Sequence, residues 1–287
     1  MAEEDRPPAM ETRLGFRWLG AAGIELVANG ETLVIDPFFS RFPLWRVWLG
    51  RVRSNRALAA EKAPRCDLVL VTHAHVDHLL DVAEVVRNTG ALVLGSPATC
   101  RLLAAEGIPA LRIHEIAPGA ELTLGSFRIR VVPGAHRTLF GRPILTGPLP
   151  SRLKPPLRAR DYRMDHCYSF LIESGGCRLL DWAGVGAEGA LPADVLFVSP
   201  CGEAADYQAL LSAVQPRAVV PIHWDDFFRP LSRPVRPMLQ PSARGWPPLQ
   251  TTDLARFRRI IKRAAPSTQV FVPRMFQAYE VPDWAGQ

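Results

Sequence analysis

The sequence predicts a mixed α/β fold built on two β-sheets. Two turn signals, Asn29-Gly30 and residues 174–176, are each flanked by strand-like segments and predict hairpins. In each half of the chain, short apolar strands that alternate with helical patterns follow the hairpin. This repeated order favours two sheets, each of which combines a hairpin with strand–helix units.

In the first half, the continuous branched run at 67–71 predicts a strand that is buried on both faces. Residues 77–88 predict a helix, because their apolar side chains fall on one face. The other elements expected in this half are strands at 16–27, 32–35 and 92–95 and a helix from Ser96-Pro97 to about residue 106.

In the second half, residues 167–173 and 178–181 flank the turn at 174–176 and form the second predicted hairpin. Two short hydrophobic strands are expected at 195–199 and 218–222, with a helix at 206–213 between them. The remaining expectations are strand-like pieces within 111–132, a helix at 252–264 and a strand at 269–272.

The composition is that of a globular protein of 287 residues, with 48% hydrophobic and 22% charged residues. No run of 18 apolar residues occurs, so we expect no transmembrane span. Residues 1–10 carry three acidic side chains and no apolar stretch, which argues against a secretory signal and predicts a cytoplasmic protein. The five cysteines show no CxxC spacing, and we expect them to be reduced.

We expect a single domain over residues 1–287, with a flexible N-terminus at 1–13. Two segments rich in proline and arginine stand apart, at 137–165 and 229–248. Structureless stretches of this length are typical of a lid or a surface insertion, and both alternatives stay open here. The formal net charge of +6 is compatible either with solvated, ion-paired arginines or with a surface that attracts anionic substrates.

The residues that point most strongly to chemistry are His73, His75, Asp77 and His78, in the order HxHxDH. They directly follow the buried strand at 67–71. Imidazole and carboxylate groups together suit Zn²⁺, Fe or Mn²⁺. In an extended turn His73 and His75 point the same way and can share one metal, whereas Asp77 and His78 can reach a second metal about 3.5–4 Å away.

Four further residues, each at the end of a hydrophobic strand, are candidates for the same site: Asp36, His136, Asp181 and His223. Together with HxHxDH, their order along nearly the whole chain resembles the motif order of the metallo-β-lactamase-fold superfamily. The resemblance implies a four-layer αββα sandwich, with two mixed sheets flanked by helices and the site at one edge between the sheets.

The resemblance also implies a ligand set for two divalent transition metal ions, with zinc expected and manganese or iron as alternatives. One ion would be bound by His73, His75 and His136, and the other by Asp77, His78 and His223. Asp181 would bridge the two ions opposite a shared hydroxide that attacks the substrate. Asp77 would act as the catalytic residue that orients the hydroxide or carries a proton, and Asp36 would support the site.

Within the superfamily, residues 18–26 (WLGAAGIEL) look like the branch that contains ascorbate-6-phosphate lactonase-like and N-acyl-phosphatidylethanolamine phospholipase D-like proteins. Ala21 stands where that branch often has histidine. Asp181 is followed by Trp182 rather than by the Thr-Gly often found in the family, so Trp182 could shape the pocket.

Four residues are candidates for substrate binding. Arg137 follows a predicted ligand and could bind a phosphate or carboxylate, and His166 lies beside Asp165 near the presumed lid. Trp182 and Trp224 each follow a predicted ligand and could line the pocket. For each of them, an ordinary structural or surface role is the alternative.

These observations predict a hydrolase that cleaves an ester, lactone or phosphodiester bond of a small anionic molecule. A nuclease is one alternative, although no nucleic-acid-binding module is visible and the arginines are not interleaved with aromatic residues. A non-catalytic metal-binding protein is the other. Assembly into a homo-oligomer stays open.

Overall fold

Two seven-stranded sheets form the centre of the structure, a computed structural model that describes residues 14–138, 144–241 and 249–281. The first sheet has the strand order β16 (Ala278–Val281), β1 (Leu14–Gly20), β2 (Gly23–Ala28), β3 (Glu31–Ile35), β4 (Leu68–Leu70), β5 (Leu92–Gly95) and β6 (Ile113–Glu115). The second has the order β15 (Gln269–Val270), β12 (Ala218–Pro221), β11 (Val195–Val198), β10 (Cys177–Trp182), β9 (Tyr168–Ser174), β8 (Phe127–Pro133) and β7 (Glu121–Leu124).

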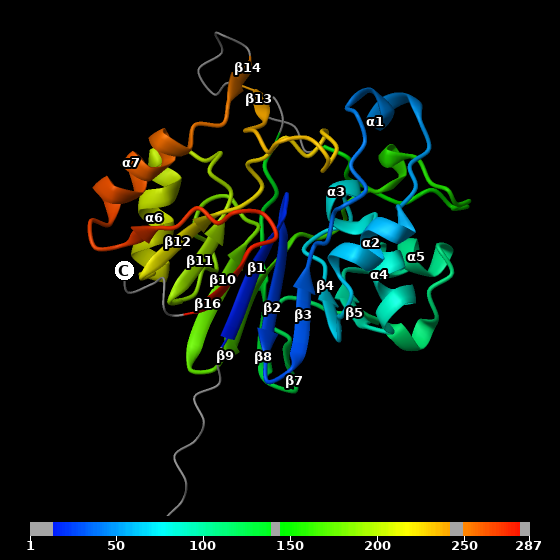
Figure 1. Cartoon of the computed structure of the whole chain (residues 1–287), viewed down its shortest axis with the longest axis horizontal. Helices are drawn as coiled ribbons and strands as arrows, with labels where there is room; N and C mark the ends of the chain where they lie inside the picture. The colour runs from blue at the N-terminus through cyan, green and yellow to red at the C-terminus, as the bar shows by residue number, and fades with distance from the viewer. Residues whose placement is uncertain (1–13, 139–143, 242–248, 282–287) are drawn as a thin grey trace, which may run out of the picture.

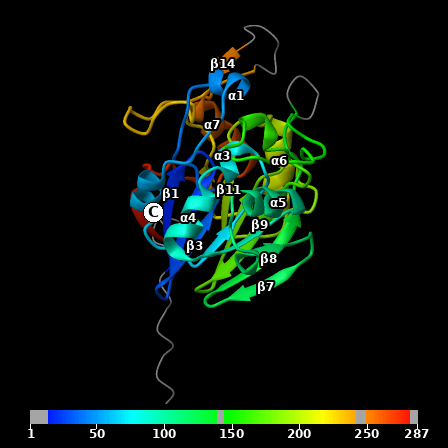
Figure 2. The same cartoon turned by 90° about the vertical axis from the view of Figure 1, so that its right-hand side faces the viewer.

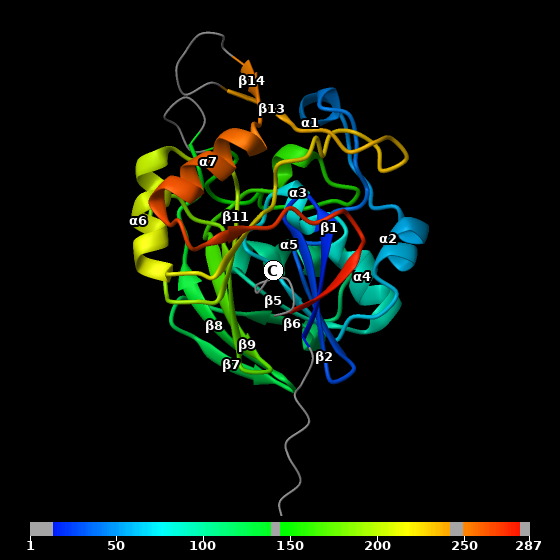
Figure 3. The same ribbon diagram turned by 60° about the vertical axis from the view of Figure 1, so that its left-hand side comes forward.

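Helices cover the outer face of each sheet (Figures 1 and 2). The first sheet is covered by α2 (Arg56–Lys62), α4 (Val82–Thr89) and α5 (Pro97–Ala105), and the second by α6 (Ala204–Val214) and α7 (Leu254–Ala264). Two short helices, α1 (Trp45–Leu49) and α3 (Val76–Leu79), and the small hairpin of β13 (Leu239–Pro241) and β14 (Leu249–Thr251) lie toward one end (Figure 3). Two 3₁₀ turns, η1 (Ala110–Arg112) and η2 (Ala159–Asp161), complete the elements.

Three apolar clusters separate the four layers. Between the sheets, Phe16 of β1 packs against Phe197 of β11 with ring centroids 5.1 Å apart. A second cluster lies between the first sheet and its helices, and a third joins Leu180 of β10 to α6 and α7. Burial of these side chains is the main source of stability, since each removes apolar area from water. The four-layer αββα sandwich expected from the sequence is therefore confirmed.

The strand pairing changes once from antiparallel to parallel within each sheet. Strands β16, β1, β2 and β3 pair antiparallel, and β3 to β6 pair parallel. In the second sheet β7 to β10 are antiparallel, and β10, β11, β12 and β15 are parallel. The turn between β2 and β3 needs Asn29 and Gly30, whose positive φ angles of 51° and 81° fit a two-residue hairpin.

The structure corrects two of the predicted elements. The predicted strand at 16–27 is two strands, because the chain turns sharply at Gly20 and Ala21, which have positive φ. The predicted helix at 77–88 is broken into α3 and α4 at Leu80 and Asp81. Asp81 turns its carboxylate inward to accept hydrogen bonds from the backbone N–H groups of Phe39 and Ser40 instead of capping α4.

The two segments rich in proline and arginine are partly described. Residues 144–165 pack against the first sheet's outer cluster through buried side chains such as Leu157 and Tyr162, and a β-bridge joins Thr146 to Met164. Residues 229–241 lead into β13. The expected flexible N-terminus at 1–13 and residues 139–143 and 242–248 lie outside the described part. Among the helices in the ranges described above, none is both long and apolar enough to cross a membrane.

Candidate metal centre

The predicted metal ligands come together at the carboxyl ends of strands from both sheets. The HxHxDH residues follow β4, His136 follows β8 and His223 follows β12. Because these strands end at the same edge of the sandwich, residues far apart in sequence meet beside α3, which contains Asp77 and His78. Two groups of three donors result, His73 with His75 and His136, and Asp77 with His78 and His223. Within each group the donor atoms lie within 4.8 Å of one another.

The first group is a triangle of imidazole rings. The ring centroids of His73 and His75 are 4.6 Å apart, those of His73 and His136 are 4.8 Å apart, and those of His75 and His136 are 4.7 Å apart. The edge-on arrangement of the rings directs nitrogen atoms toward a common space, as shown by the 3.1 Å distance from His73 Nε2 to His75 Nδ1.

Each ring of the first group is oriented by a hydrogen bond at its other nitrogen. His73 Nδ1 lies 3.0 Å from the Thr72 hydroxyl oxygen, and His136 Nδ1 donates to the Arg137 carbonyl oxygen at 2.7 Å. His75 Nε2 lies 3.2 Å and 3.3 Å from the carbonyl oxygens of Ile144 and Leu145. These contacts leave Nε2 of His73, Nδ1 of His75 and Nε2 of His136 free to bind a metal. In metal sites the second nitrogen of a ligand histidine usually makes such an outer hydrogen bond, which fixes the orientation of the ring.

The three rings are held in the neutral form that a metal requires. Burial, followed by the neighbouring histidines, lowers the pKa of His73 well below its usual value. Burial also lowers the pKa of His75, and it lowers the pKa of His136 to about 4. Neutral imidazoles at neutral pH present lone pairs instead of competing protons.

The second group adds a carboxylate to two histidines. Asp77 Oδ2 lies 3.2 Å from His223 Nε2 and 3.5 Å from His78 Nε2. Burial alone would raise the pKa of Asp77, but His78 and His223 hold it well below its usual value. The two groups are adjacent, since the ring centroids of His73 and His78 are only 3.9 Å apart.

Asp36 connects the two groups through hydrogen bonds to Thr72 and His78. Its side chain is fully buried and accepts hydrogen bonds from the Thr72 N–H at 2.9 Å and from the Thr72 hydroxyl. It also accepts from His78 Nδ1 at 2.6 Å, which directs His78 Nε2 toward Asp77. Although burial lowers the pKa of His78, the carboxylates of Asp36 and Asp77 outweigh that effect and raise it to about 9.

Asp181 is a buried carboxylate without a donor. It is the penultimate residue of β10 and lies on the face toward the other sheet, because Leu179 two residues earlier packs between the sheets. Among the described residues no group donates a hydrogen bond to its side chain, which is 3% exposed, and burial raises its pKa well above the usual value. A buried carboxylate costs free energy unless it is paired, protonated or bound to a cation.

The donors therefore fit divalent transition metals. Five imidazoles and one carboxylate form two three-donor groups, and Asp181 is a further carboxylate without a partner in the part of the chain the structure describes. Histidine and carboxylate ligands of this kind suit zinc, iron and manganese.

The four residues expected to contact substrate lie in different places. Trp182 packs in the cluster against α6 and α7, on the face of β10 opposite to Asp181, so its side chain does not face the histidines. Trp224 is buried between the sheets, where it stacks on Trp18 at 5.3 Å. His166 is exposed and stacks on Tyr168 at 5.9 Å.

Arg137 remains beside the centre through its backbone, which bonds to His136 as described. Its guanidinium donates to Gln240 Oε1 of β13 at 3.3 Å. Sequence reasoning did not single out the inward carboxylates Asp81 and Asp225. Both stand beside metal-motif residues, and that proximity is the one signal that could have marked them.

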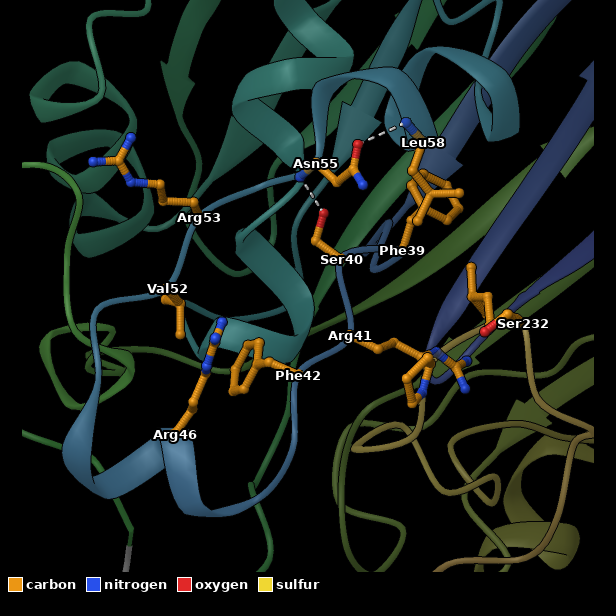
Figure 4. A pocket seen from close by; sticks show the side chains of 12 residues that line it. Phe39, Ser40, Arg41, Phe42, Arg46, Val52, Arg53, Asn55, Leu58 and Ser232 are labelled. Atoms are coloured by element: carbon orange, nitrogen blue, oxygen red, sulfur yellow. Dashed lines mark hydrogen bonds between the residues drawn. The ribbon is translucent and has the colours of Figure 1, made fainter.

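A cavity of about 330 Å³ lies beside the centre rather than in it. Figure 4 shows its lining, which includes Phe39, Ser40 and Arg41 after β3 and residues of the loop at 230–232. A second cavity, of about 300 Å³, lies between the start of α5 and residues 146–149. Neither is lined by a residue of the two donor groups.

Comparisons with known proteins place the chain in a family. A family model described as "Beta-lactamase superfamily domain" matches residues 31–224. A UPF0173 metal-dependent hydrolase from Carboxydothermus hydrogenoformans is 25% identical over 72% of this chain and 83% of the relative. Another, from Chelativorans, is 29% identical over 43% of this chain, and the match spans only about half of that relative (48%).

Solved structures show the same fold at low identity. Igni18, a metallo hydrolase from Ignicoccus hospitalis, has a TM-score of 0.59 at 18% identity and covers 94% of this chain and 98% of its own. The metallo-β-lactamase fold protein YhfI from Bacillus subtilis has a TM-score of 0.57 at 14% identity, with 94% and 99% covered. Because the family model spans well over half of the sequence, and the sheets and layers agree with it, the chain belongs to the metallo-β-lactamase-fold superfamily.

Proposed function

We propose that the chain is a dinuclear metal-dependent hydrolase that cleaves an ester, lactone or phosphodiester bond of a small anionic molecule. The observation that carries the proposal is the pair of adjacent three-donor groups, together with the buried carboxylate of Asp181, to which no described residue donates a hydrogen bond. The names of the relatives support it, since the Carboxydothermus and Chelativorans proteins are called metal-dependent hydrolases and Igni18 a metallo hydrolase.

In this proposal each group would hold one ion, and Asp181 would supply a further carboxylate ligand. Zinc is the metal we expect, and iron and manganese are the alternatives compatible with the same donors. When bound, two divalent cations lower the pKa of a water molecule and polarise the bond under attack.

Asp77 is the residue we assign to orienting the attacking water. Its Oδ2 faces His78 and His223, whereas Oδ1 has no hydrogen-bond partner among the residues described. The low pKa of Asp77 keeps it ionised, so Oδ1 can accept a hydrogen bond from water and orient it. His78 cannot take this role, because its Nδ1 proton is held by Asp36.

An anionic substrate is supported by the segment that borders the first group. The carbonyl oxygens of Ile144 and Leu145 lie beside His75, so the segment that follows them starts at the metal centre. That segment carries more basic than acidic side chains between residues 150 and 163. Arginine recognises phosphate and carboxylate groups through paired hydrogen bonds. We retain the lactonase-like and phospholipase D-like branch as the proposed relationship within the superfamily.

A substrate panel tests the proposal. The zinc-loaded chain is assayed with lactones, carboxylic esters, phosphodiesters, a β-lactam and a short RNA, beside the variant Asp77→Asn. His114→Gln is the matched control, because His114 is an exposed histidine on β6 outside both groups. We expect one of the first three classes to be hydrolysed, with a loss of at least about 100-fold in Asp77→Asn and none in the control.

Two results would contradict the proposal. Hydrolysis of RNA alone would identify a nuclease instead. An absence of any Asp77-dependent activity in a chain that holds two ions would favour a non-catalytic metal-binding protein.

A further inference from the structure

Three residues other than glycine adopt left-handed backbone conformations around the second donor group. They are Ala21, Asp36 and His223, with φ angles of 46°, 43° and 58°. Such conformations are unfavourable for residues with a Cβ and persist only where the surrounding structure holds them. His223 is itself one of the donors, so the contacts that hold its backbone also determine where its ring lies.

The backbone of His223 is held by Ala21. The His223 N–H donates to the Ala21 carbonyl oxygen at 2.8 Å, and Trp18 Nε1 donates to the same oxygen at 3.0 Å. On its other side, the Ala21 N–H donates to Asp225 Oδ1 at 2.9 Å. The β1–β2 turn is therefore attached to the His223 loop at two points.

Asp225 is in turn held by Arg41. The guanidinium donates to Asp225 Oδ2 at 2.6 Å, and the two side chains are only 4% and 1% exposed. Figure 4 shows the Arg41 side chain extending from the segment after β3 toward the loop at 230–232, away from Arg46 and Arg53. The pair thus crosses from the first sheet to the loop that follows β12 in the second.

The segment that carries Arg41 also holds the helix that carries the other two donors. The N–H groups of Phe39 and Ser40 donate to Asp81 at 2.6 Å and 2.7 Å. Asp81 directly follows α3 and Leu80, and α3 contains Asp77 and His78. One short segment, residues 39–41, therefore connects the helix and the loop that together make the second group.

The first group has separate outer contacts. Its rings are oriented by Thr72 and by the carbonyl oxygens of Arg137, Ile144 and Leu145. None of these atoms bonds to Arg41 or Asp225 in the part of the chain the structure describes. Loss of the Arg41–Asp225 pair should therefore weaken metal binding by the second group and leave binding by the first group unchanged.

We infer that Arg41 and Asp225 are positioning residues for the second metal: the buried pair holds Asp225 against Ala21, and Ala21 holds His223 in its ligand conformation. The inference rests on the proposed function, because it takes His223 as a ligand of the second ion. Neither residue is a metal ligand or touches the reacting atoms. Their effect is expected in the affinity for the second ion.

The test measures the two ions separately. The EDTA-treated chain is titrated with Zn²⁺ by calorimetry and with Co²⁺ by visible absorption, which reports coordination directly. The principal variant is the double substitution Arg41→Met with Asp225→Asn, which removes both charges together and keeps an oxygen that can accept from the Ala21 N–H. This design avoids a buried charge without a partner, which alone could prevent folding.

A matched control comes from the same loop. Arg236 pairs with Asp226 at 2.8 Å, but Arg236 is exposed and does not contact Ala21. Arg236→Met should bind both ions as the wild type does. The single variant Arg41→Lys keeps a positive charge beside Asp225. It should therefore bind the second ion more tightly than the double variant does.

We expect the double variant to bind the first ion with unchanged affinity and the second roughly 10- to 100-fold more weakly, the usual effect of losing an outer contact of a metal ligand. Unchanged affinity for both ions would overturn the inference, and so would equal weakening of both, which indicates a merely structural pair. A wild-type chain that holds fewer than two ions overturns the dinuclear function and the inference together. A wild type that holds two ions, with a double variant that holds both as tightly, overturns the inference alone.

Discussion

Replacement of Asp36 by asparagine should remove a pH-dependent part of the stability of the metal-free protein. Asp36 Oδ1 accepts from the Thr72 N–H, and an asparagine oxygen can keep that bond. Oδ2 accepts from the Thr72 hydroxyl and from His78 Nδ1. In Asp36→Asn an NH₂ group replaces Oδ2, so a donor meets His78 Nδ1–H and the acceptor of that proton is lost.

The magnitude follows from the pKa of His78, which is raised from 6.5 to about 9. Each tenfold change in proton affinity corresponds to about 1.4 kcal/mol, so folding favours the protonated ring by about 3 kcal/mol. Asp36 makes the largest favourable contribution to this, followed by Asp77. Because the folded pKa is raised, the stabilisation is complete below pH 6.5 and is lost as the pH rises through 9.

Urea unfolding of the EDTA-treated wild type and Asp36→Asn at pH 6 and at pH 9.5 measures the effect. We expect the variant to be less stable at pH 6 by about 2–3 kcal/mol more than at pH 9.5. Asp67→Asn is the control, since Asp67 accepts from the Thr32 N–H at the opposite end of β3 and β4 and contacts no histidine in the described chain. A difference between wild type and Asp36→Asn that does not depend on pH would refute the reasoning.

Three further outcomes are expected. Burial lowers the pKa of His136 to about 4, so the unfolded chain takes up a proton at this histidine at a higher pH than the folded chain does. The metal-free protein should therefore lose stability as the pH falls from 6.5 to 4. An equal thermal midpoint at pH 7 and pH 5 in EDTA would contradict this. Asp81→Ala should lower the free energy of unfolding in urea by about 3 kcal/mol, because it leaves two buried backbone N–H groups without an acceptor. Glu121→Ala, which breaks an exposed ion pair, should lower it by at most about 1 kcal/mol. Similar losses in both variants would count against the role of Asp81. Phe197→Ala should cost about 3–5 kcal/mol through a cavity between the sheets, and metal content should stay unchanged in the folded variant; a loss below about 1 kcal/mol would show that the site collapses.

Much of the fold follows from local patterns in the sequence. The strand predicted at 92–95 is β5, and the helix expected from Ser96-Pro97 begins there because Ser96 accepts from the Thr99 N–H as an N-cap. The turn at 29–30 and the hairpin around 174–176 were also predicted, since glycine and asparagine mark such turns. In each of these cases the determining interactions lie within a few residues.

Two features that the sequence does not predict depend on distant contacts. Helices α1 and α2 and strand β16 were not predicted, and β16 exists because it pairs with β1 at the other end of the chain. The break between α3 and α4 was missed for the same reason, because Asp81 is drawn inward by Phe39 and Ser40, about 40 residues earlier. No pattern in the neighbouring sequence indicates such a contact.

The candidate site divides in the same way. HxHxDH marks metal chemistry by itself, because four donor side chains follow one strand. His136 and His223 join them only through the fold, at the ends of β8 and β12. The pair of Arg41 and Asp225 spans 184 residues and has no pattern of its own in the sequence.

The most direct test of the account is the metal content of the purified chain, measured by mass spectrometry beside the variants His73→Gln and His223→Gln. We expect two transition metal ions per wild-type chain. We also expect one ion in each variant, retained by the group that the substitution leaves intact. A folded wild-type chain that holds one ion or none after equilibration with zinc would contradict the account.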